Sequence, residues 1–217
     1  MFEEILSKTA KESLALLGGL ESIKKSYLAG GTAAALQLGH RFSFDFDLFT
    51  PEQFEVKILA QLFQKELRNF KLERTAWGTI YGYIQESKTK KNRFSFLYYQ
   101  YPLLFPTQNY LGVNLAHLKD IGAMKIAAIS DRGSKRDFID LYFLCQKNIL
   151  DIKETLSLYN QKYKTLEQNK IHILRSLTYF ADAEKQTMPK MIKEVDWKKV
   201  QEFFTKEVKK ISREILK

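Results

Sequence analysis

The chain is poor in cysteine, histidine and proline, and these shortages exclude several classes of protein. A single cysteine, Cys145, rules out an internal disulfide, and its apolar neighbours in LYFLCQ indicate a buried small side chain. Three scattered histidines and one cysteine do not make a zinc site. No apolar run reaches the roughly 18 residues of a membrane span. The N-terminal MFEEILSKTAKESL has acids where a signal peptide needs a basic start, so we expect a cytoplasmic protein with no membrane association.

What the chain has in quantity is hydrophobic residues and positive charge. With 217 residues, 45% of them hydrophobic, it is long enough to bury one substantial core. The 35 Lys and Arg residues against 25 Asp and Glu give a net charge of +10, which favours phosphate-rich partners. Solvated lysines on amphipathic helices explain the same surplus, so charge alone does not assign a nucleic-acid partner.

Residues 27–50, YLAGGTAAALQLGHRFSFDFDLFT, hold the most informative pattern in the chain. A short apolar run is broken by Gly30 and Gly31, and a helix-forming segment follows at 32–39. The start of a helix gathers unpaired backbone N–H groups, and glycine lets a phosphate approach the main chain closely. We therefore predict that Gly30, Gly31 and Thr32 form a phosphate-binding turn.

The second half of this stretch, RFSFDFDLF at 41–49, alternates between polar and apolar side chains. A period of two predicts a half-buried strand, with Ser43, Asp45 and Asp47 on one face and the apolar residues towards a core. The residues expected to face the core are Phe42, Phe44, Phe46 and Leu48. The two carboxylates would lie roughly 7 Å apart along the strand and repel each other. A divalent cation such as Mg²⁺ or Mn²⁺, which binds carboxylate and phosphate oxygens together, would convert that repulsion into a site.

These two motifs, in this order, resemble the nucleotidyltransferase superfamily. Together with AMKIAAISDRGSKRDFIDLYFL at 123–144, they resemble in particular the AbiEii/AbiGii toxin-type nucleotidyltransferases of bacterial phage-defence and toxin–antitoxin systems. The likeness runs from about Leu28 to Leu144. It implies an enzyme that transfers a nucleotidyl group from an NTP to an RNA, such as tRNA, or to a protein hydroxyl. It also implies a cognate antitoxin as partner.

Lys125 carries the one charge in the apolar segment IGAMKIAAI at 121–129. Its neighbours on that helix supply no counter-charge, and an unpaired buried ammonium is costly. The side chain must therefore reach water or meet an anion from elsewhere in the fold or from a ligand. The resemblance places the motif lysine of the family at this position, which implies that Lys125 neutralises the triphosphate.

The next predicted helix begins with Ser134 and carries two aspartates on one face. Ser134 and Asp137 form a capping-box-like pair, and Arg136 is spaced to form an ion pair with Asp140. The same KRDFID segment matches the Lys-Asp-x-x-Asp motif of the family. That match implies a catalytic or triphosphate-orienting acid, so both a structural and a functional interpretation stand for these aspartates.

Residues 69–102 predict an antiparallel meander of three strands, FKLERTAW, TIYGYIQE and RFSFLYYQYP. Ser95 falls on the opposite face from Phe94 and Phe96, at a position where nucleotidyltransferases commonly place a third metal-binding carboxylate. The chain departs from the superfamily pattern here. Glu86 or an acid of the C-terminal helices, such as Asp137, is an alternative source of that carboxylate.

The whole pattern predicts an α/β (α+β) fold: a nucleotidyltransferase-like mixed sheet at 1–115 and a helical C-terminal lobe at 116–217 that closes over a cleft. We predict a metal-dependent nucleotidyltransferase that acts as a toxin. The predicted catalytic residues are Asp45, Asp47, Lys125 and Asp137, with Mg²⁺ or Mn²⁺ on Asp45 and Asp47. The predicted NTP-binding residues are Gly30, Gly31, Thr32, Arg41, Ser43, Ser95 and Asp140. Two alternatives remain: a catalytically silent nucleotide- or RNA-binding module, motivated by Ser95, and an interaction protein that uses its basic helices.

Overall fold

A computed structural model of the protein describes residues 1–85, 91–164 and 170–215. The chain divides into two compact units. The sheet unit comprises Phe2–Leu36 and Ser43–His117, and the helical unit comprises Met1, Gln37–Phe42 and Leu118–Lys217. The short segment Gln37–Phe42 therefore groups with helices that follow it by more than seventy residues in sequence.

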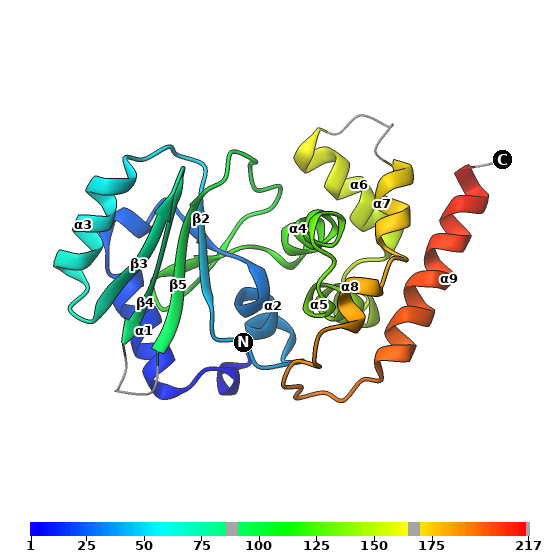
Figure 1. The fold of residues 1–217 in the computed structure, drawn as a ribbon, viewed down its shortest axis with the longest axis horizontal. Coiled ribbons are helices and arrows are strands. Elements are labelled where there is room, and N and C mark those ends of the chain that lie inside the picture. Colours follow the sequence, from blue (N-terminus) through cyan, green and yellow to red (C-terminus); the bar gives the residue numbers. More distant parts are fainter. Residues whose placement is uncertain (86–90, 165–169, 216–217) are drawn as a thin grey trace. The chain divides into compact units, whose positions relative to one another are not determined.

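The described part of the sheet unit is built on one mixed sheet of seven strands, in the order β3-β4-β5-β2-β1-β7-β6 (Figure 1). β1 pairs antiparallel with β2 and parallel with β7, and β2 pairs parallel with β5. This mixed sheet, followed by a helical C-terminal region, confirms the predicted fold class. The strands are β1 Tyr27–Leu28, β2 Phe46–Thr50, β3 Phe70–Ala76, β4 Thr79–Gln85, β5 Lys91–Tyr98, β6 Gln108–Tyr110 and β7 Val113–Leu115.

Helix α3 covers one face of the strands that form the predicted meander. The ring of Phe63 on α3 contacts Phe70, Phe94 and Phe96 at centroid distances of 6.0, 5.3 and 5.5 Å. Burial of this aromatic cluster fixes which residues of β5 point towards α3, and Ser95 consequently lies on the opposite face. The helical elements of this unit are η1 Glu3–Ile5, α1 Lys8–Gly18, η2 Glu21–Ile23, the start of α2 Gly30–Leu38, and α3 Val56–Glu66.

Strand β2 begins at Phe46, whereas the alternating pattern predicts a strand from Arg41. Phe44 is 46% exposed and Ser43 is buried, so the prediction that Phe44 faces a core is wrong. The cause is Thr32, whose hydroxyl donates to the Asp45 carbonyl at 2.6 Å and lies 3.0 Å from the Ser43 hydroxyl. This contact holds residues 43–45 against the start of α2, outside the ladder of the sheet.

The hairpin of β6 and β7 is not predicted from the sequence. Each strand has three residues, too few for a period-of-two pattern to stand out. The turn between them uses Leu111 and Gly112, both at positive φ. It lies so close to α1 that a Cβ on Gly18 would be 2.2 Å from the Leu111 carbonyl oxygen.

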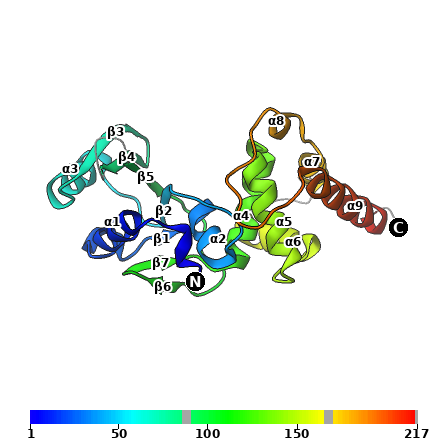
Figure 2. The same ribbon diagram turned by 90° about the horizontal axis from the view of Figure 1, so that it is seen from below.

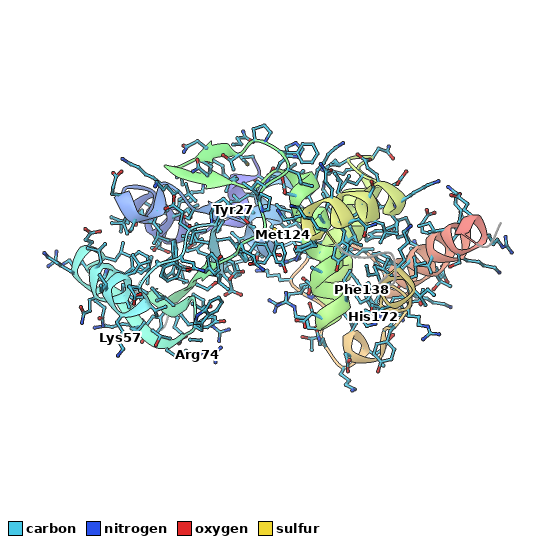
Figure 3. The ribbon with its side chains drawn as sticks, turned by 90° about the horizontal axis from the view of Figure 1, so that it is seen from above. Tyr27, Lys57, Arg74, Met124, Phe138 and His172 are labelled. Carbon is cyan, nitrogen blue, oxygen red and sulfur yellow. The ribbon has the colours of Figure 1, made fainter. Side chains whose placement is uncertain are left out.

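The helical unit is organised around α4 and α5, with α6 and α7 packed on α4 (Figure 2). Phe138 of α5, labelled in Figure 3, is fully buried in ring contact with Phe180, Trp197 and Phe204. None of the described helices combines the length and apolar character needed to cross a membrane. The helices are α4 Leu118–Asp131, α5 Lys135–Gln146, α6 Ile152–Tyr163, α7 Lys170–Ser176, α8 Ala181–Glu184 and α9 Trp197–Ile215.

Candidate functional site

In the sheet unit, the predicted phosphate-binding turn forms the start of α2. Gly30 follows β1 almost directly and has φ of +66°, in the left-handed region that favours glycine. A Cβ added at Gly30 would lie 3.0 Å from Oδ2 of Asp47. The backbone conformation therefore favours glycine at this position, and a larger residue would also press on the Asp47 carboxylate. The main chain of the turn and the Asp47 carboxylate are close neighbours.

Asp47 is fixed by bonds on both sides of β2. Its backbone carbonyl accepts a hydrogen bond from Ala29 at 3.1 Å. Its side-chain Oδ1 accepts one from the Ser95 hydroxyl at 2.5 Å, because Asp47 and Ser95 are direct partners in the parallel pairing of β2 and β5. The structure thus brings Ser95 to the face of Asp47, as the alternation of Phe94 and Phe96 predicts.

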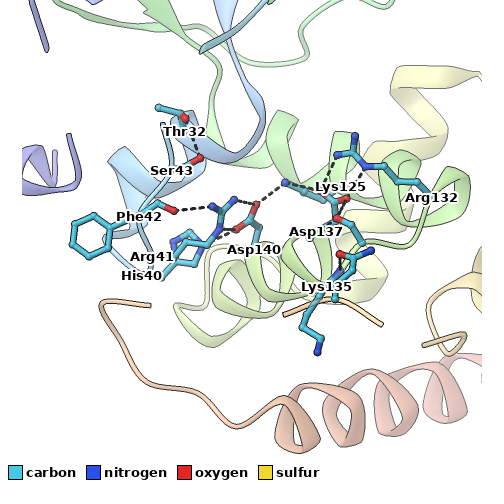
Figure 4. Close-up of polar contacts among 12 residues, drawn as sticks. Thr32, His40, Arg41, Phe42, Ser43, Lys125, Arg132, Lys135, Asp137 and Asp140 are labelled. Atoms are coloured by element: carbon cyan, nitrogen blue, oxygen red, sulfur yellow. Dashed lines mark hydrogen bonds and ion pairs between the residues drawn. The ribbon is translucent and has the colours of Figure 1, made fainter. Parts of the chain in front are cut away.

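Asp45 lies just before β2, and its backbone is held by Thr32 rather than by a neighbouring strand. The contact between Thr32 and Ser43 is drawn in Figure 4. The Asp45 side chain is half-buried. Among the described residues its carboxylate has no hydrogen bond or ion pair, which leaves both oxygens available to a ligand.

The residues present fit a cation that is shared with a substrate. In the described part of the chain, no group of three or more His, Cys, Asp or Glu side chains is arranged to hold a metal ion. Ser95, at the position where the resemblance implies a third carboxylate, offers Asp47 a hydroxyl, and Glu86 lies outside the described residues. Mg²⁺ is commonly bound by one or two carboxylates plus substrate phosphates. Asp45 and Asp47, next to a turn of glycine and Thr32, match that donor set.

In the helical unit, Lys125 finds its counter-charge on α5. Its Nζ lies 2.8 Å from Oδ1 of Asp137 and 2.5 Å from Oδ2 of Asp140 (Figure 4). Lys125 is only 5% exposed. Of the possibilities that the sequence leaves open for this ammonium, the structure shows an anion from elsewhere in the fold.

Asp140 is completely buried and contacts three basic side chains, those of Lys125, Arg41 and His40. Arg41 donates from Nε and Nη2 at 2.6 and 2.9 Å, and His40 Nε2 lies 2.7 Å from Oδ1. The predicted ion pair between Arg136 and Asp140 is wrong, because Arg136 is exposed while Asp140 faces α4 and the segment 40–41. The sequence led us to assign Arg41 to NTP binding, and we did not predict a role for His40. The two adjacent basic residues in LGHR were the only sign that this segment meets a buried acid.

Asp137 both caps α5 and binds basic groups. Its backbone N–H donates to the Ser134 hydroxyl at 3.4 Å, and the same hydroxyl donates to Oδ2 at 2.5 Å, which confirms the predicted capping pair. Arg132 adds hydrogen bonds of 3.0 and 3.3 Å, a contact that sequence analysis did not predict. Asp137 thus belongs to the same cluster as Lys125.

Mutual attraction keeps this cluster ionised. Burial alone would raise the pKa of Asp140, but Lys125 and Arg41 hold it well below its usual range. Burial opposes ionisation of Asp137 in the same way, yet Lys125 and Arg132 lower its pKa to about 2. Burial alone would lower the pKa of Lys125, but attraction to the Asp137 and Asp140 carboxylates outweighs burial, so the pKa of Lys125 is raised.

His40 behaves differently from its charged neighbours. Its burial is the largest influence and lowers the pKa of the imidazole despite the hydrogen bond to Asp140. We therefore treat the ring as neutral near pH 7. The cations Arg41, Lys125 and Arg132 then exceed the two carboxylates by one charge.

Comparison with known proteins places these features in a family. Residues 94–214 match a family model described as "Nucleotidyl transferase AbiEii toxin, Type IV TA system". An uncharacterized protein of Aquifex aeolicus, aq_aa25, is 38% identical over 213 residues, which cover 94% of this chain and 96% of that protein.

Solved structures share the fold at low sequence identity. JHP933 from Helicobacter pylori is 18% identical with a TM-score of 0.54, covering 97% of both chains. A putative nucleotidyltransferase from H. pylori is 17% identical with a TM-score of 0.56, covering 96% of this chain and 97% of the other. MenT4, a nucleotidyltransferase toxin from Mycobacterium tuberculosis H37Rv, is 13% identical with a TM-score of 0.51, covering 92% and 82%. The chain belongs to the AbiEii nucleotidyltransferase toxin family of type IV toxin–antitoxin systems, as its ordered motifs predict.

Proposed function

We propose that this protein transfers a nucleotidyl group from an NTP to a hydroxyl of an RNA or protein acceptor, with a divalent cation held by Asp45 and Asp47. Membership of the family implies the NTP substrate and a toxin role. The observation that carries the proposal is the approach of the Asp47 carboxylate to the Gly30 turn, where a Cβ would be 3.0 Å from Oδ2.

Each residue of the sheet unit has a defined part in this proposal. The backbone N–H groups at the start of α2, at Gly31 and Thr32, bind phosphate oxygens. Ser95 holds Oδ1 of Asp47, so that Oδ2 stays on the side of the turn. Asp45 contributes the second carboxylate. When bound, Mg²⁺ would neutralise charge on the phosphates.

The reaction itself asks little of the protein beyond positioning. The acceptor hydroxyl gives up its proton to solvent and its oxygen bonds to the α-phosphorus, while the bond from that phosphorus to the α,β-bridging oxygen breaks and pyrophosphate leaves. Such chemistry depends mainly on orientation and on electrostatic stabilisation of the phosphates. Two carboxylates, a glycine turn and a hydroxyl that fixes one carboxylate are consistent with that requirement.

Within the helical unit, we assign Lys125, Asp137 and Asp140 first to holding α4 and α5 in register. The Lys125 ammonium already has two carboxylate partners at 2.8 and 2.5 Å. To neutralise a triphosphate, the role implied by its motif position, Lys125 would have to use its third N–H or exchange one of these carboxylates for a phosphate. Substitution of Lys125 separates the two roles, as described in the Discussion.

The proposal is tested by incubating purified protein with Mg²⁺, labelled NTPs and bulk tRNA. The wild type is expected to transfer label, and Asp45→Ala is expected to lose about a hundredfold or more of that activity. Glu66→Ala, which removes an exposed carboxylate at the end of α3, is the matched control and should retain it. Equal activity in Asp45→Ala and Glu66→Ala would remove the carboxylate pair from the mechanism.

A catalytically silent nucleotide-binding module of the same fold is the second candidate, and it is favoured by Ser95 in the place of a third carboxylate. This alternative predicts that the wild type binds Mg²⁺–NTP in a titration calorimeter but transfers no label to RNA or protein. Label transfer by the wild type, lost in Asp45→Ala, would exclude it.

A further inference from the structure

Strands β3, β4 and β5 have a second face, on the side away from α3, and Asp47 stands at one end of it. The paired residues across the sheet form a row that runs from Asp47 to Ser95, then to Tyr81 and Arg74. Neighbouring strands are roughly 4.8 Å apart, so Tyr81 lies about 10 Å and Arg74 about 14 Å from Asp47. An aromatic and basic surface therefore begins directly beside the Asp47 carboxylate.

A second row lies beside the first. Arg93 pairs with Tyr83, and Tyr83 pairs with Lys71. A cation lies over the tyrosine ring of each row: Arg74 Cζ is 4.3 Å from the centroid of Tyr81, and Lys91 Nζ, from the neighbouring pair of Lys91 and Gln85, is 4.3 Å from that of Tyr83. We call these residues the aromatic–basic face; its members are Lys71, Arg74, Tyr81, Tyr83, Lys91 and Arg93.

The charge on this face is strongly one-sided. Lys71, Arg74, Lys91 and Arg93 are exposed, and Glu73, in the irregular part of β3, is paired with Lys91 at 3.2 Å. Lys71 and Arg93 have no hydrogen bond or ion pair from their side chains within the described residues. Arg74, on β3, is labelled in Figure 3. On the other face, Phe94 and Ile80 are buried beneath α3, so the cations and rings do not serve that core.

We propose that the aromatic–basic face binds a single-stranded segment of a nucleic-acid acceptor and directs its reactive hydroxyl towards Asp47. This inference rests on the proposed function. Unpaired bases stack on aromatic rings and on guanidinium planes, and a guanidinium packed on Tyr81 offers such a plane. The exposed cations are placed to contact the intervening phosphates. A protein acceptor would gain little from four cations and two rings arranged in rows.

The proposal predicts separate effects of charge and of ring. The probe is a fluorescein-labelled single-stranded RNA of about ten nucleotides, within the usual site size of such surfaces. Its affinity is measured by anisotropy over a range of salt concentrations, without NTP or Mg²⁺. Arg93→Gln should weaken binding about fivefold and reduce the slope of log K against log salt by about 0.7. Tyr83→Leu should weaken binding about tenfold with the slope unchanged.

Lys65→Gln on α3 is the matched control, because it removes one exposed charge outside the aromatic–basic face. It should bind RNA like the wild type, and thermal melts should show all variants folded. Equal losses in Arg93→Gln and Lys65→Gln would indicate diffuse charge attraction and overturn the proposal. A wild type that transfers label to protein but does not bind the RNA would also overturn it, while leaving the proposed function intact. Failure of the proposed function is observed separately, as absence of label transfer with Mg²⁺ and NTP.

Discussion

The Ser95 hydroxyl donates to Oδ1 of Asp47 at 2.5 Å, directly across the parallel pairing of β5 and β2. A hydroxyl here does what a third carboxylate could not do, because it orients Asp47 without adding a negative charge. In the described part of the chain, the candidate site therefore has two carboxylates, Asp45 and Asp47. The hydrogen bond from Ser95 occupies Oδ1 of Asp47 and leaves Oδ2 towards the Gly30 turn.

Ser95→Asp is expected to lower both stability and activity. Ser95 is 7% exposed, so a carboxylate there would face Asp47 in a poorly solvated position and repel it. We expect a loss of about 1–3 kcal/mol in the free energy of unfolding without Mg²⁺, together with slower label transfer. Ser95→Asn, which keeps a donor and adds no charge, is the control. Faster transfer and tighter Mg²⁺ binding in Ser95→Asp would instead mean that the missing carboxylate limits catalysis.

Lys125→Met should destabilise the helical unit. The change keeps an apolar side chain of similar length and leaves Asp137 and Asp140 buried without their shared cation. Removing one partner of a buried ion pair costs about 3–5 kcal/mol, and the remaining Arg41 and Arg132 favour the lower value. Urea unfolding measures this loss, with the exposed Lys198→Met as control. A well-folded Lys125→Met protein that binds NTP more weakly would assign Lys125 to the phosphates.

Gly30→Ala should impair function more than its effect on stability explains. Alanine at this position would have to adopt an unfavourable φ of +66°, and its Cβ would press on Oδ2 of Asp47. Gly78 is a matched control, because its φ is +59° and a Cβ there would lie 3.1 Å from Tyr98 Cβ. Both alanine variants should lose about 1–2 kcal/mol of stability. Only Gly30→Ala should lose NTP binding, measured by calorimetry; equal NTP affinity in both variants would contradict the assigned turn.

His40 should make stability depend on pH in mildly acidic solution. Burial lowers its pKa below 6.5 in the folded protein, so the unfolded chain binds a proton first as the pH falls. Stability should consequently decrease below about pH 6.5, by up to about 1.4 kcal/mol per pH unit, until the pH reaches the folded pKa. Urea unfolding at several pH values measures this slope, and His40→Gln should show a smaller one. An identical slope in the variant would show that His40 does not titrate with folding.

The sequence predicted correctly those strands in which one face is buried against a helix, because burial of one face produces alternation of apolar and polar residues. Alternation in β4 and β5 was readable because Ile80, Phe94 and Phe96 all pack beneath α3. The same rule failed at Phe44, because the hydroxyl of Thr32 captures the backbone of Asp45. Such a bond between residues thirteen positions apart leaves no periodic trace.

The electrostatic cluster shows a second limit of sequence analysis. The need for an anion near Lys125 follows from its apolar segment, but the identity of the anion does not. Asp140 contacts His40 and Arg41, which precede it by 100 and 99 positions in the sequence and which only folding brings close to it. The i,i+4 spacing favoured Arg136 as the partner of Asp140, but in the fold Asp140 is buried while Arg136 is exposed.

The strand that carries Asp47 has a further property. β2 is the fourth of the seven strands in the described sheet, with three on either side. Strands at the edges of a sheet open first in local unfolding, and central strands open last. The backbone amides of β2 and of the adjoining β5 should therefore be among the slowest in this unit to exchange with deuterium. The carboxylate that would hold the cation is anchored in the part of the sheet that fluctuates least.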